Sequence, residues 1–342
     1  MSRETLSSTA ARIAEHVERH GQPEIRIVFH GGEPLLAGTA FLADAARLIR
    51  SAVPPSTRVD CTTQTNGVLL TGSALDDLLR ADIGVGVSID GAPDDHDRHR
   101  QFRGGRGSHA EVAAALRRLA ARPHDRLYRG LLCTIDLDND PLGTYESLLE
   151  FRPPRIDFLL PHGNWTTPPP GRSTSPDETP YANWLIPVFA EWYENYRPGG
   201  TVVRLFEEIL SLILGGPSHS EMIGTSRVGL LVIETNGALE QVDTLKSAYQ
   251  GAAGVGLDVF SHPFDALLEH PAIAARQIGL EALCDTCRAC DLAEICGAGY
   301  YPHRYLAGDG YRNPSVYCPD LMALIRHVDA QVRPEVEAVR AR

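Results

Sequence analysis

The sequence lacks the features of a membrane, secreted or nucleic-acid-binding protein. No apolar run approaches the roughly 18 residues that a membrane-spanning helix needs. Residues 1–17 have neither a basic start nor a continuous apolar core, so they are not a secretory signal. Basic residues are scarce, with 32 Lys and Arg against 44 Asp and Glu and a net charge of −12. Because a phosphate backbone is bound by clustered Lys and Arg, we assign no nucleic-acid partner. Since the sequence has neither a membrane-spanning run nor a secretory signal, we assign no membrane partner and expect a cytoplasmic protein.

Cysteine is absent before Cys61. Of the 7 cysteines, Cys61 and Cys133 stand alone in apolar stretches, and we interpret both as small buried hydrophobic residues. The others crowd the last part of the chain, at Cys284, Cys287, Cys290, Cys296 and Cys318. In a reducing compartment such a cluster indicates metal binding rather than disulfides.

Length and periodicity indicate two domains, the first of the α/β class. A chain of 342 residues exceeds what one hydrophobic core usually supports. Apolar spacing predicts an opening helix at 4–20, strands at 25–29, 58–63, 83–89, 129–134 and 156–160, and intervening helices at 41–49, 74–80, 110–121 and 145–150. This alternation predicts a parallel sheet, fully wound or curled into a partial barrel. In both cases the ligand lies at the carboxyl ends of the strands.

The segment after the fifth strand predicts the passage to a second domain. Residues 161–180 are rich in Pro, Ser and Thr and indicate a long exposed loop on the ligand-facing rim. Apolar helices are expected at 182–196 and 202–214. The pair Asn236-Gly237 between two strand-like runs predicts a tight hairpin, since both residues accept a positive φ. We place the boundary between about Tyr196 and Ser226 and assign domains 1–200 and 201–342.

Each of the first three predicted strands ends in a polar turn that contains glycine. The turns read HGGEP at 30–34, QTNG at 64–67 and SIDG at 88–91. Taken alone, the first turn is equally well explained as an ordinary strand-to-helix connection in which Pro34 sets φ. Three such turns on one rim indicate a ligand site, because glycine permits close backbone approach and the polar side chains supply hydrogen-bond partners.

These three turns, in this order, resemble radical SAM enzymes. The resemblance implies that the first turn lies along the methionine moiety of S-adenosylmethionine and that its acidic side chain and backbone take the amino group. It assigns this role to Gly31, Gly32, Glu33 and Pro34, and a cofactor-facing role to Asn66, Ser88 and Asp90. An arginine in the charged segment 96–100 is either a partner of the cofactor carboxylate or part of a solvated loop.

The C-terminal cysteines have the spacing Cys287-x2-Cys290-x5-Cys296-x21-Cys318. Four thiolates can bind zinc or a [4Fe–4S] cluster, and spacing alone does not decide between them. The surrounding run, CRACDLAEICGAGYYPHRY, resembles the SPASM domain of peptide-modifying radical SAM enzymes. The resemblance implies that these four cysteines hold an auxiliary [4Fe–4S] cluster, with Cys284 as a bystander thiol.

Many SPASM domains hold a second auxiliary cluster, but its ligand positions are occupied here by Val242 and Tyr300. We therefore expect that cluster to be absent. Asp243 stands where related enzymes keep a catalytic base. The alternative interpretation of Asp243 is an aspartate at the hairpin edge that caps the following turn.

Nearly the whole chain is similar to the SPASM maturases that act on FxSxx-type precursor peptides and build cyclophane crosslinks. This resemblance implies a precursor peptide as substrate, an electron donor such as a ferredoxin or flavodoxin, and C–C bond formation after hydrogen abstraction from a side-chain β-carbon. A rival hypothesis is a non-catalytic peptide-binding partner, and a third is a zinc-stabilised scaffold.

The radical-generating cluster of this family needs three closely spaced cysteines after the first strand, and the sequence has none there. We therefore expect a partial (β/α) barrel of the radical SAM type lacking its first strand, joined to a small C-terminal SPASM iron–sulfur domain. Such a chain is expected to be truncated or inactive in reductive cleavage of S-adenosylmethionine. The strand at 25–29 is then expected to form an unpaired edge.

Overall fold

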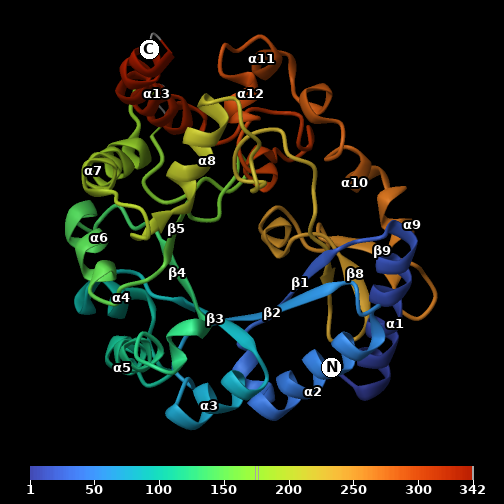
Figure 1. The fold of residues 1–342 in the computed structure, drawn as a ribbon. Coiled ribbons are helices and arrows are strands. Elements are labelled where there is room, and N and C mark those ends of the chain that lie inside the picture. Colours follow the sequence, from blue (N-terminus) through green and yellow to red (C-terminus); the bar gives the residue numbers. More distant parts are fainter. Residues whose placement is uncertain (174, 176, 341–342) are drawn as a thin grey trace.

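A curved parallel sheet and a small antiparallel sheet organise the chain. The computed structural model describes residues 1–173, 175 and 177–340. The first sheet has the order β1-β2-β3-β4-β5-β6 and the second the order β7-β8-β9 (Figure 1). The strands are β1 (Glu24–Phe29), β2 (Arg58–Thr65), β3 (Ile83–Ser88), β4 (Tyr128–Thr134), β5 (Arg155–Leu159), β6 (Val202–Val203), β7 (Val232–Ile233), β8 (Ala238–Glu240) and β9 (Gly254–Asp258).

Helices cover the outer face of the parallel sheet. In Figure 1 the strands form an arc, and the C-terminal elements lie at its open side. The helices of the first half are α1 (Arg3–His20), α2 (Thr39–Ala52), α3 (Gly72–Arg80), α4 (Pro93–His99), α5 (His109–Leu119), α6 (Pro141–Leu149), α7 (Pro180–Asn195) and α8 (Arg204–Ile213). The later ones are α9 (Asp265–Leu268), α10 (Pro271–Ala274), α11 (Asp285–Arg288), α12 (Ala293–Cys296) and α13 (Cys318–Arg340). Among the described residues, no helix has the length and apolarity that crossing a membrane requires.

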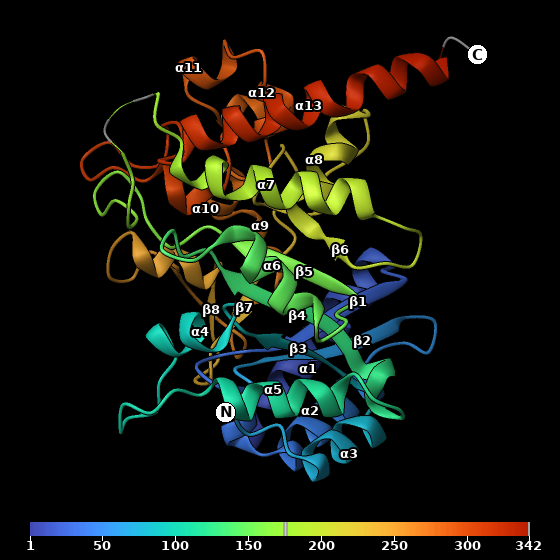
Figure 2. The ribbon, with the colours of Figure 1, turned by 90° about the vertical axis from the view of Figure 1, so that its left-hand side faces the viewer.

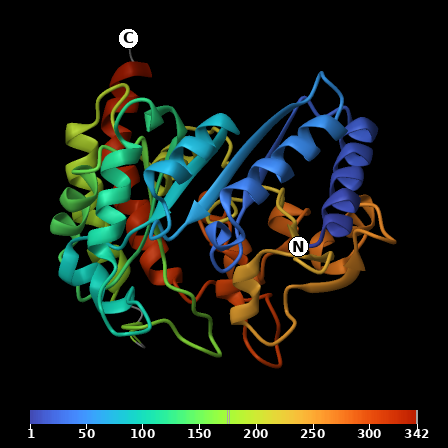
Figure 3. The same cartoon turned by 90° about the horizontal axis from the view of Figure 1, so that it is seen from below.

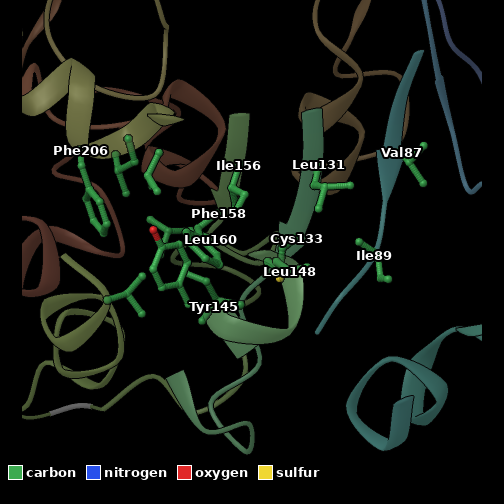
Figure 4. Packing of buried hydrophobic residues seen from close by; sticks show 14 of the residues in the cluster. Val87, Ile89, Leu131, Cys133, Tyr145, Leu148, Ile156, Phe158, Leu160 and Phe206 are labelled. Atoms are coloured by element: carbon green, nitrogen blue, oxygen red, sulfur yellow. The ribbon is translucent and has the colours of Figure 1, made fainter. Parts of the chain in front are cut away.

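The main core lies between the sheet and its outer helices. Alternate residues of the central strands point into this core, as the period of two in a strand requires. Figure 4 shows Tyr145 and Leu148 of α6 beside Phe158 and Cys133 of the sheet, and the rings of Tyr145 and Phe158 are 6.4 Å apart. Cys61 and Cys133 are both buried in this core, as predicted.

A second core joins the N-terminal helices to the C-terminal domain. Ile13 and Val17 of α1 and Ile49 of α2 belong to one apolar cluster with residues of the small sheet and α9, among them Val255 and Leu267. The first helix of the chain is thus packed against the last third of it. Figure 2 shows α13 running alongside α7 on another side of the molecule, where the two helices are in contact.

The five predicted strands are all present in the parallel sheet, and their order along the chain is the predicted one. A sixth strand, Val202–Val203, occupies the start of the segment predicted to be helical, so α8 begins at Arg204. Within the described residues β1 pairs with β2 alone and forms one edge of the sheet.

The hairpin is confirmed, but its turn is not the predicted one. The backbone N–H of Gly237 donates to the carbonyl of Glu234 at 2.9 Å, which makes a four-residue turn. Only Gly237 has a positive φ, of 91°, whereas Asn236 does not. Asn236 instead accepts the N–H of Ala238 with its side chain at 3.0 Å. Its amide side chain, which can cap the turn locally, replaces the left-handed backbone that we expected.

The segment predicted to be an exposed loop at 161–180 is partly buried. The side chain of Asn164 is completely inaccessible, and the indole of Trp165 donates to the carbonyl of Pro314 at 2.7 Å. The hydroxyl of Tyr317 donates to the carbonyl of Pro161 at 2.7 Å. These long-range bonds attach the connection to the C-terminal domain, and composition alone did not reveal them.

The buried carboxylate of Asp320 caps α7 from a different helix. Its Oδ1 accepts the N–H groups of Tyr181 and Ala182 at 2.8 and 3.1 Å. We predict that Asp320→Ala lowers the free energy of unfolding by about 2 kcal/mol, because two donors in the first turn of α7 lose their partner. Asp320→Asn, which keeps an acceptor oxygen, should cost less than half as much in urea titrations. Equal losses for the two variants would contradict this.

Candidate functional site

The three predicted turns lie together at the carboxyl edge of the parallel sheet, directly after β1, β2 and β3. Gly31 has a φ of 101°, and neither Gly31 nor Gly32 has any atom within 4 Å of the position a Cβ would take. Pro34 is the first residue of a short 3-10 helix that Glu33 caps. The backbone of the two glycines is therefore open to close approach by a ligand.

Glu33 ties the first turn to the second. One carboxylate oxygen accepts the N–H of Leu35 at 2.9 Å and the hydroxyl of Thr65 at 2.7 Å. The other accepts the N–H of Asn66 at 2.8 Å. We had expected this side chain to serve the cofactor's amino group, whereas here it holds three donors of the protein. The second oxygen, with one bond, keeps acceptor capacity for a further donor.

Asp90 ties the third strand to the fourth. Its carboxylate accepts the N–H of Thr134 at 2.9 Å and pairs through both oxygens with the guanidinium of Arg100. The residue is only 8 % exposed. Arg100 is thus the partner of a protein carboxylate and not a solvated loop residue. A bidentate pair of this kind fixes the carboxylate in one orientation. Asp90 is thus a buried residue that stabilises the rim.

His96 supports the same turn from beneath. Its Nδ1 accepts the N–H of Asp90 at 3.2 Å, and its Nε2 lies 3.0 Å from the hydroxyl of Ser108. Because Ser108 donates its own proton to the carbonyl of Arg100, Nε2 is the donor in this pair. Burial, aided by the nearby Arg100 charge, lowers the pKa of His96 to about 4, so the ring is neutral at pH 7.

Polar side chains line the inner face of the sheet, which the sequence analysis did not identify. Gln64 donates to the hydroxyl of Ser88 at 3.1 Å, and a Cβ at Gly86 would lie 2.3 Å from the Gln64 side-chain oxygen. Asp60 pairs with Arg129 at 3.4 Å across the face. In β2 half-buried residues alternate with buried ones, but two of the buried residues are Thr63 and Thr65, so the sequence itself shows no polar and apolar alternation that could have revealed this face.

The clustered cysteines come from three short stretches that converge at the start of α13. Burial, then a hydrogen bond with Cys284, raises the pKa of Cys287 to about 12, and charge on Cys318 and Cys296 adds to the effect. The pKa of Cys318 is also raised, first by burial and then by the neighbouring Cys290 and Cys284. All five thiols therefore lie near one another, and a bound metal must displace their protons.

The free thiols are not drawn together as closely as one bound ion would draw them. A tetrahedral zinc ion with Zn–S bonds of about 2.3 Å brings its sulfurs within about 3.8 Å of one another. Among the described residues, no three cysteines have sulfurs within 4.8 Å of each other. A [4Fe–4S] cluster is bulkier and is held by four thiolates at wider separations.

Arg304 braces the turn that follows Cys296. Residues 297–299 all have positive φ values between 57° and 63°. Burial raises the pKa of the Cys296 thiol to about 11, and backbone N–H groups at Ala298 and Gly299 oppose part of that rise. The buried guanidinium of Arg304 donates to the carbonyls of Gly297 and Gly299 at 2.6 and 2.5 Å. A fixed turn with inward N–H groups is suited to a cluster ligand.

Asp243 lies at the start of a short 3-10 helix after the hairpin, within a group of three carboxylates. Lys246 is at the centre of the group, with its Nζ 3.0 Å from Asp243, 2.6 Å from Glu234 and 2.8 Å from Glu240. Hydrogen bonds to Glu234 and Glu240 raise the pKa of Lys246, which stays charged. The side chain of Asp243 is 44 % exposed, so solvent or substrate can reach it.

The two positions that replace cysteine ligands of a second cluster are part of the packing here. The hydroxyl of Tyr300 donates to Thr244 Oγ1 at 3.1 Å. Val242 packs against a small apolar cluster around Leu245. Neither side chain is a metal ligand, and we retain the expectation that one auxiliary cluster is bound.

Comparison with known proteins gives the family context. The Radical SAM superfamily matches residues 3–140. A serine-type anaerobic sulfatase-maturating enzyme from Klebsiella aerogenes is 23 % identical over 87 % of this chain and 73 % of its own length. The fold matches native anSMEcpe with bound AdoMet and Kp18Cys peptide, with a TM-score of 0.82 and 21 % identity over 99 % of this chain and 90 % of that one. Streptococcus suis SuiB bound to precursor peptide SuiA gives a TM-score of 0.52 and 13 % identity over 91 % and 69 %.

The sheet, its strand-end turns and these matches define a radical SAM enzyme. Among such enzymes, the chain is homologous to the anaerobic sulfatase-maturating enzymes. Enzymes of this class use S-adenosylmethionine and [4Fe–4S] clusters.

The neutral His96 predicts a specific pH dependence of stability. Its folded pKa of about 4 lies below the usual value of 6.5, so unfolding takes up a proton between these pH values. Stability is therefore lost as pH falls through this window, by roughly 3 kcal/mol in total. Between pH 6.5 and 4, we predict that the free energy of unfolding falls less steeply in His96→Gln than in the wild type. The two slopes should differ by about 1.4 kcal/mol per pH unit. An unchanged slope in urea titrations would refute the assignment.

Iron loading tests the proposed ligand set. After anaerobic reconstitution, we predict about four irons per chain in the wild type and in Cys284→Ser, and a clear loss in Cys296→Ser and Cys318→Ser. Iron analysis and the visible absorption of the cluster measure this. Loss of iron in Cys284→Ser with retention in Cys318→Ser would reassign the fourth ligand, and zinc uptake without iron would favour a zinc scaffold.

Proposed function

We propose that this protein modifies a ribosomally made precursor peptide and binds S-adenosylmethionine at the carboxyl edge of the parallel sheet. The observation that carries the proposal is the open space above Gly31 and Gly32, next to the polar inner face of the sheet. Backbone groups at 31–34 would take the amino group of the cofactor. Asn66 and Ser88, on the next two turns, are the side chains best placed to complete the site.

The inner face of the sheet supports a peptide substrate. Asp60 and Gln64 are half-buried, and Arg129 is 42 % exposed in its side chain, so each has polar atoms available to a ligand. Backbone amides of a peptide need such partners when they leave water. Relatives of the same fold bind a Kp18Cys peptide and the precursor peptide SuiA, which agrees with a peptide as substrate class.

Asp243 is the proposed catalytic base. The ammonium of Lys246 lies 3.0 Å from Asp243 and fixes the orientation of its carboxylate. The exposed Asp243 differs from Asp90, whose carboxylate is buried and fully paired. For the alternative role, capping of the turn, the structure offers Asp243 a position as first residue of the 3-10 helix, next to the ion pair with Lys246.

Cys287, Cys290, Cys296 and Cys318 would hold the auxiliary [4Fe–4S] cluster, which supplies a one-electron acceptor to such chemistry. The proposed product is a cyclophane, a C–C crosslink between a side-chain β-carbon and an aromatic ring, and the electron partner is a ferredoxin or flavodoxin. Outside the C-terminal group the described residues include two cysteines, Cys61 and Cys133, and both are buried in separate strands. They do not form the three-cysteine set of the radical-generating cluster. We therefore derive no step through that cluster.

The test is co-expression with candidate precursor peptides, followed by mass spectrometry. A crosslink lowers the peptide mass by H2, and fragmentation locates it. We predict that Asp243→Asn reduces turnover by about 10²-fold or more, as loss of a general base does, without weakening S-adenosylmethionine binding.

Glu234→Gln is the matched control, because Glu234 also bonds Lys246 and lies on the hairpin. Its turnover should stay within a few-fold of the wild type. Equal losses in both variants would mean that Asp243 only anchors Lys246. Tight peptide binding without any change of peptide mass would instead support the non-catalytic binding partner.

A further inference from the structure

Two histidines and an aspartate converge on the outer surface, on helices that carry neither the cysteines nor the strand-end turns. Nδ1 of His16 lies 2.8 Å from Oδ1 of Asp265, and Nε2 of His20 lies 2.9 Å from the same oxygen. One ligand atom from each residue lies within 4.8 Å of the other two. The histidines belong to α1 and the aspartate begins α9, and these helices are adjacent in Figure 1 and Figure 3.

The helix positions explain why the rings meet. Residues four apart lie on the same face of a helix, so His16 and His20 lie side by side, one turn apart. Their ring centroids are 4.5 Å apart. The ring of His16 also lies 6.2 Å from that of Phe264, which belongs to the second core. Packing therefore holds one imidazole, and with it the direction of its nitrogen.

The donor set is that of a divalent transition-metal ion. Two imidazole nitrogens and one carboxylate oxygen are borderline ligands that suit zinc and its neighbours. Zinc with bonds of about 2.0–2.1 Å places its ligand atoms about 3.4 Å apart. The two distances from the rings to Oδ1 need to open by only about half an ångström. The three side chains are 20–37 % exposed, so they have room to do so.

Arg19 is the charged residue that competes with an ion at this place. Its guanidinium lies 3.1 Å from Oδ2 of Asp265, and its side chain is 62 % exposed. The ion pair uses Oδ2, which also lies 3.1 Å from Nε2 of His20, whereas Oδ1 is the oxygen that faces both rings. An exposed pair of this kind is weak and is easily displaced.

We propose that His16, His20 and Asp265 form a binding site for a divalent transition-metal ion, with Zn²⁺ as the test ion. Each neutral imidazole would move its proton to its other ring nitrogen, leaving a lone pair for the metal, and water would fill the fourth position. The ion links the first helix of the radical SAM region to the C-terminal domain. The same interface holds the bonds from Arg12 to the carbonyls of Val259 and Phe260, at 3.0 and 3.3 Å.

A cluster of three carboxylates elsewhere in the protein is not an equivalent candidate for a metal site. Glu234, Glu240 and Asp243 are also close enough together to hold an ion. The ammonium of Lys246 occupies their centre, within 3.0 Å of all three. That group is already neutralised by a cation of the protein.

The experiment is calorimetric titration of Zn²⁺ into the iron-loaded protein, in which the four cluster cysteines are bound to iron. We expect one zinc per chain in the wild type, and at least about tenfold weaker binding in His16→Ala, His20→Ala and Asp265→Asn. The melting temperature should rise with zinc in the wild type only, since binding to the folded state alone stabilises it. The three side chains are partly exposed, so these variants should fold.

His99→Ala is the matched control. His99 lies 3.0 Å from Asp136, which also pairs with an arginine, but it has no second histidine beside it. This variant should bind zinc as the wild type does. Equal zinc affinity in the wild type, His20→Ala and His99→Ala would overturn the proposal and leave the trio as a hydrogen-bonded contact between α1 and α9. Failure of peptide modification would not affect this result, since the readout is zinc affinity.

Discussion

Backbone N–H groups at the carboxyl ends of parallel strands have no partner in the sheet, and satisfying them determines the shape of the rim. Glu33 accepts N–H groups from its own turn and from the turn after β2. Asp90 accepts the N–H of Thr134 at the end of β4. Each carboxylate thus links two neighbouring strands. Gly31 and Gly32 stay open to a ligand while Glu33 holds their turn in place.

The C-terminal domain depends on the same sheet for its position. It contacts α1 and α2 through the second apolar core, and α7 through the cap from Asp320. The partly buried connection at 161–180 adds hydrogen bonds from Trp165 and Tyr317. These contacts join the part of the chain that carries the cysteine cluster and Asp243 to the sheet that carries the strand ends and the polar inner face. Cofactor, base and cluster are therefore parts of one proposed reaction.

The sequence predicted the parts of the fold that depend on local periodicity. The five long strands and the order of helices followed from apolar spacing, but β6 has two residues and forms only because it pairs with β5. The prediction for the turn at Asn236-Gly237 was wrong because Asn236 stabilises the turn with a side-chain hydrogen bond and not with a left-handed backbone. Residue types likewise indicated Glu33 and Asp90 as site residues. Their partners, Thr65, Thr134 and Arg100, depend on which strands are neighbours, and this is not visible from spacing.

Hydrogen exchange with and without S-adenosylmethionine tests the central claim, that the carboxyl edge of the sheet is the cofactor site. The open turn at 31–32 should exchange more slowly when the cofactor is bound to the anaerobically reconstituted protein, because a bound ligand protects the amides that it contacts. The amides of Asp90 and Thr134, already bonded within the protein, should change little. Protection confined to the C-terminal domain, with no change at 30–34, would contradict the account.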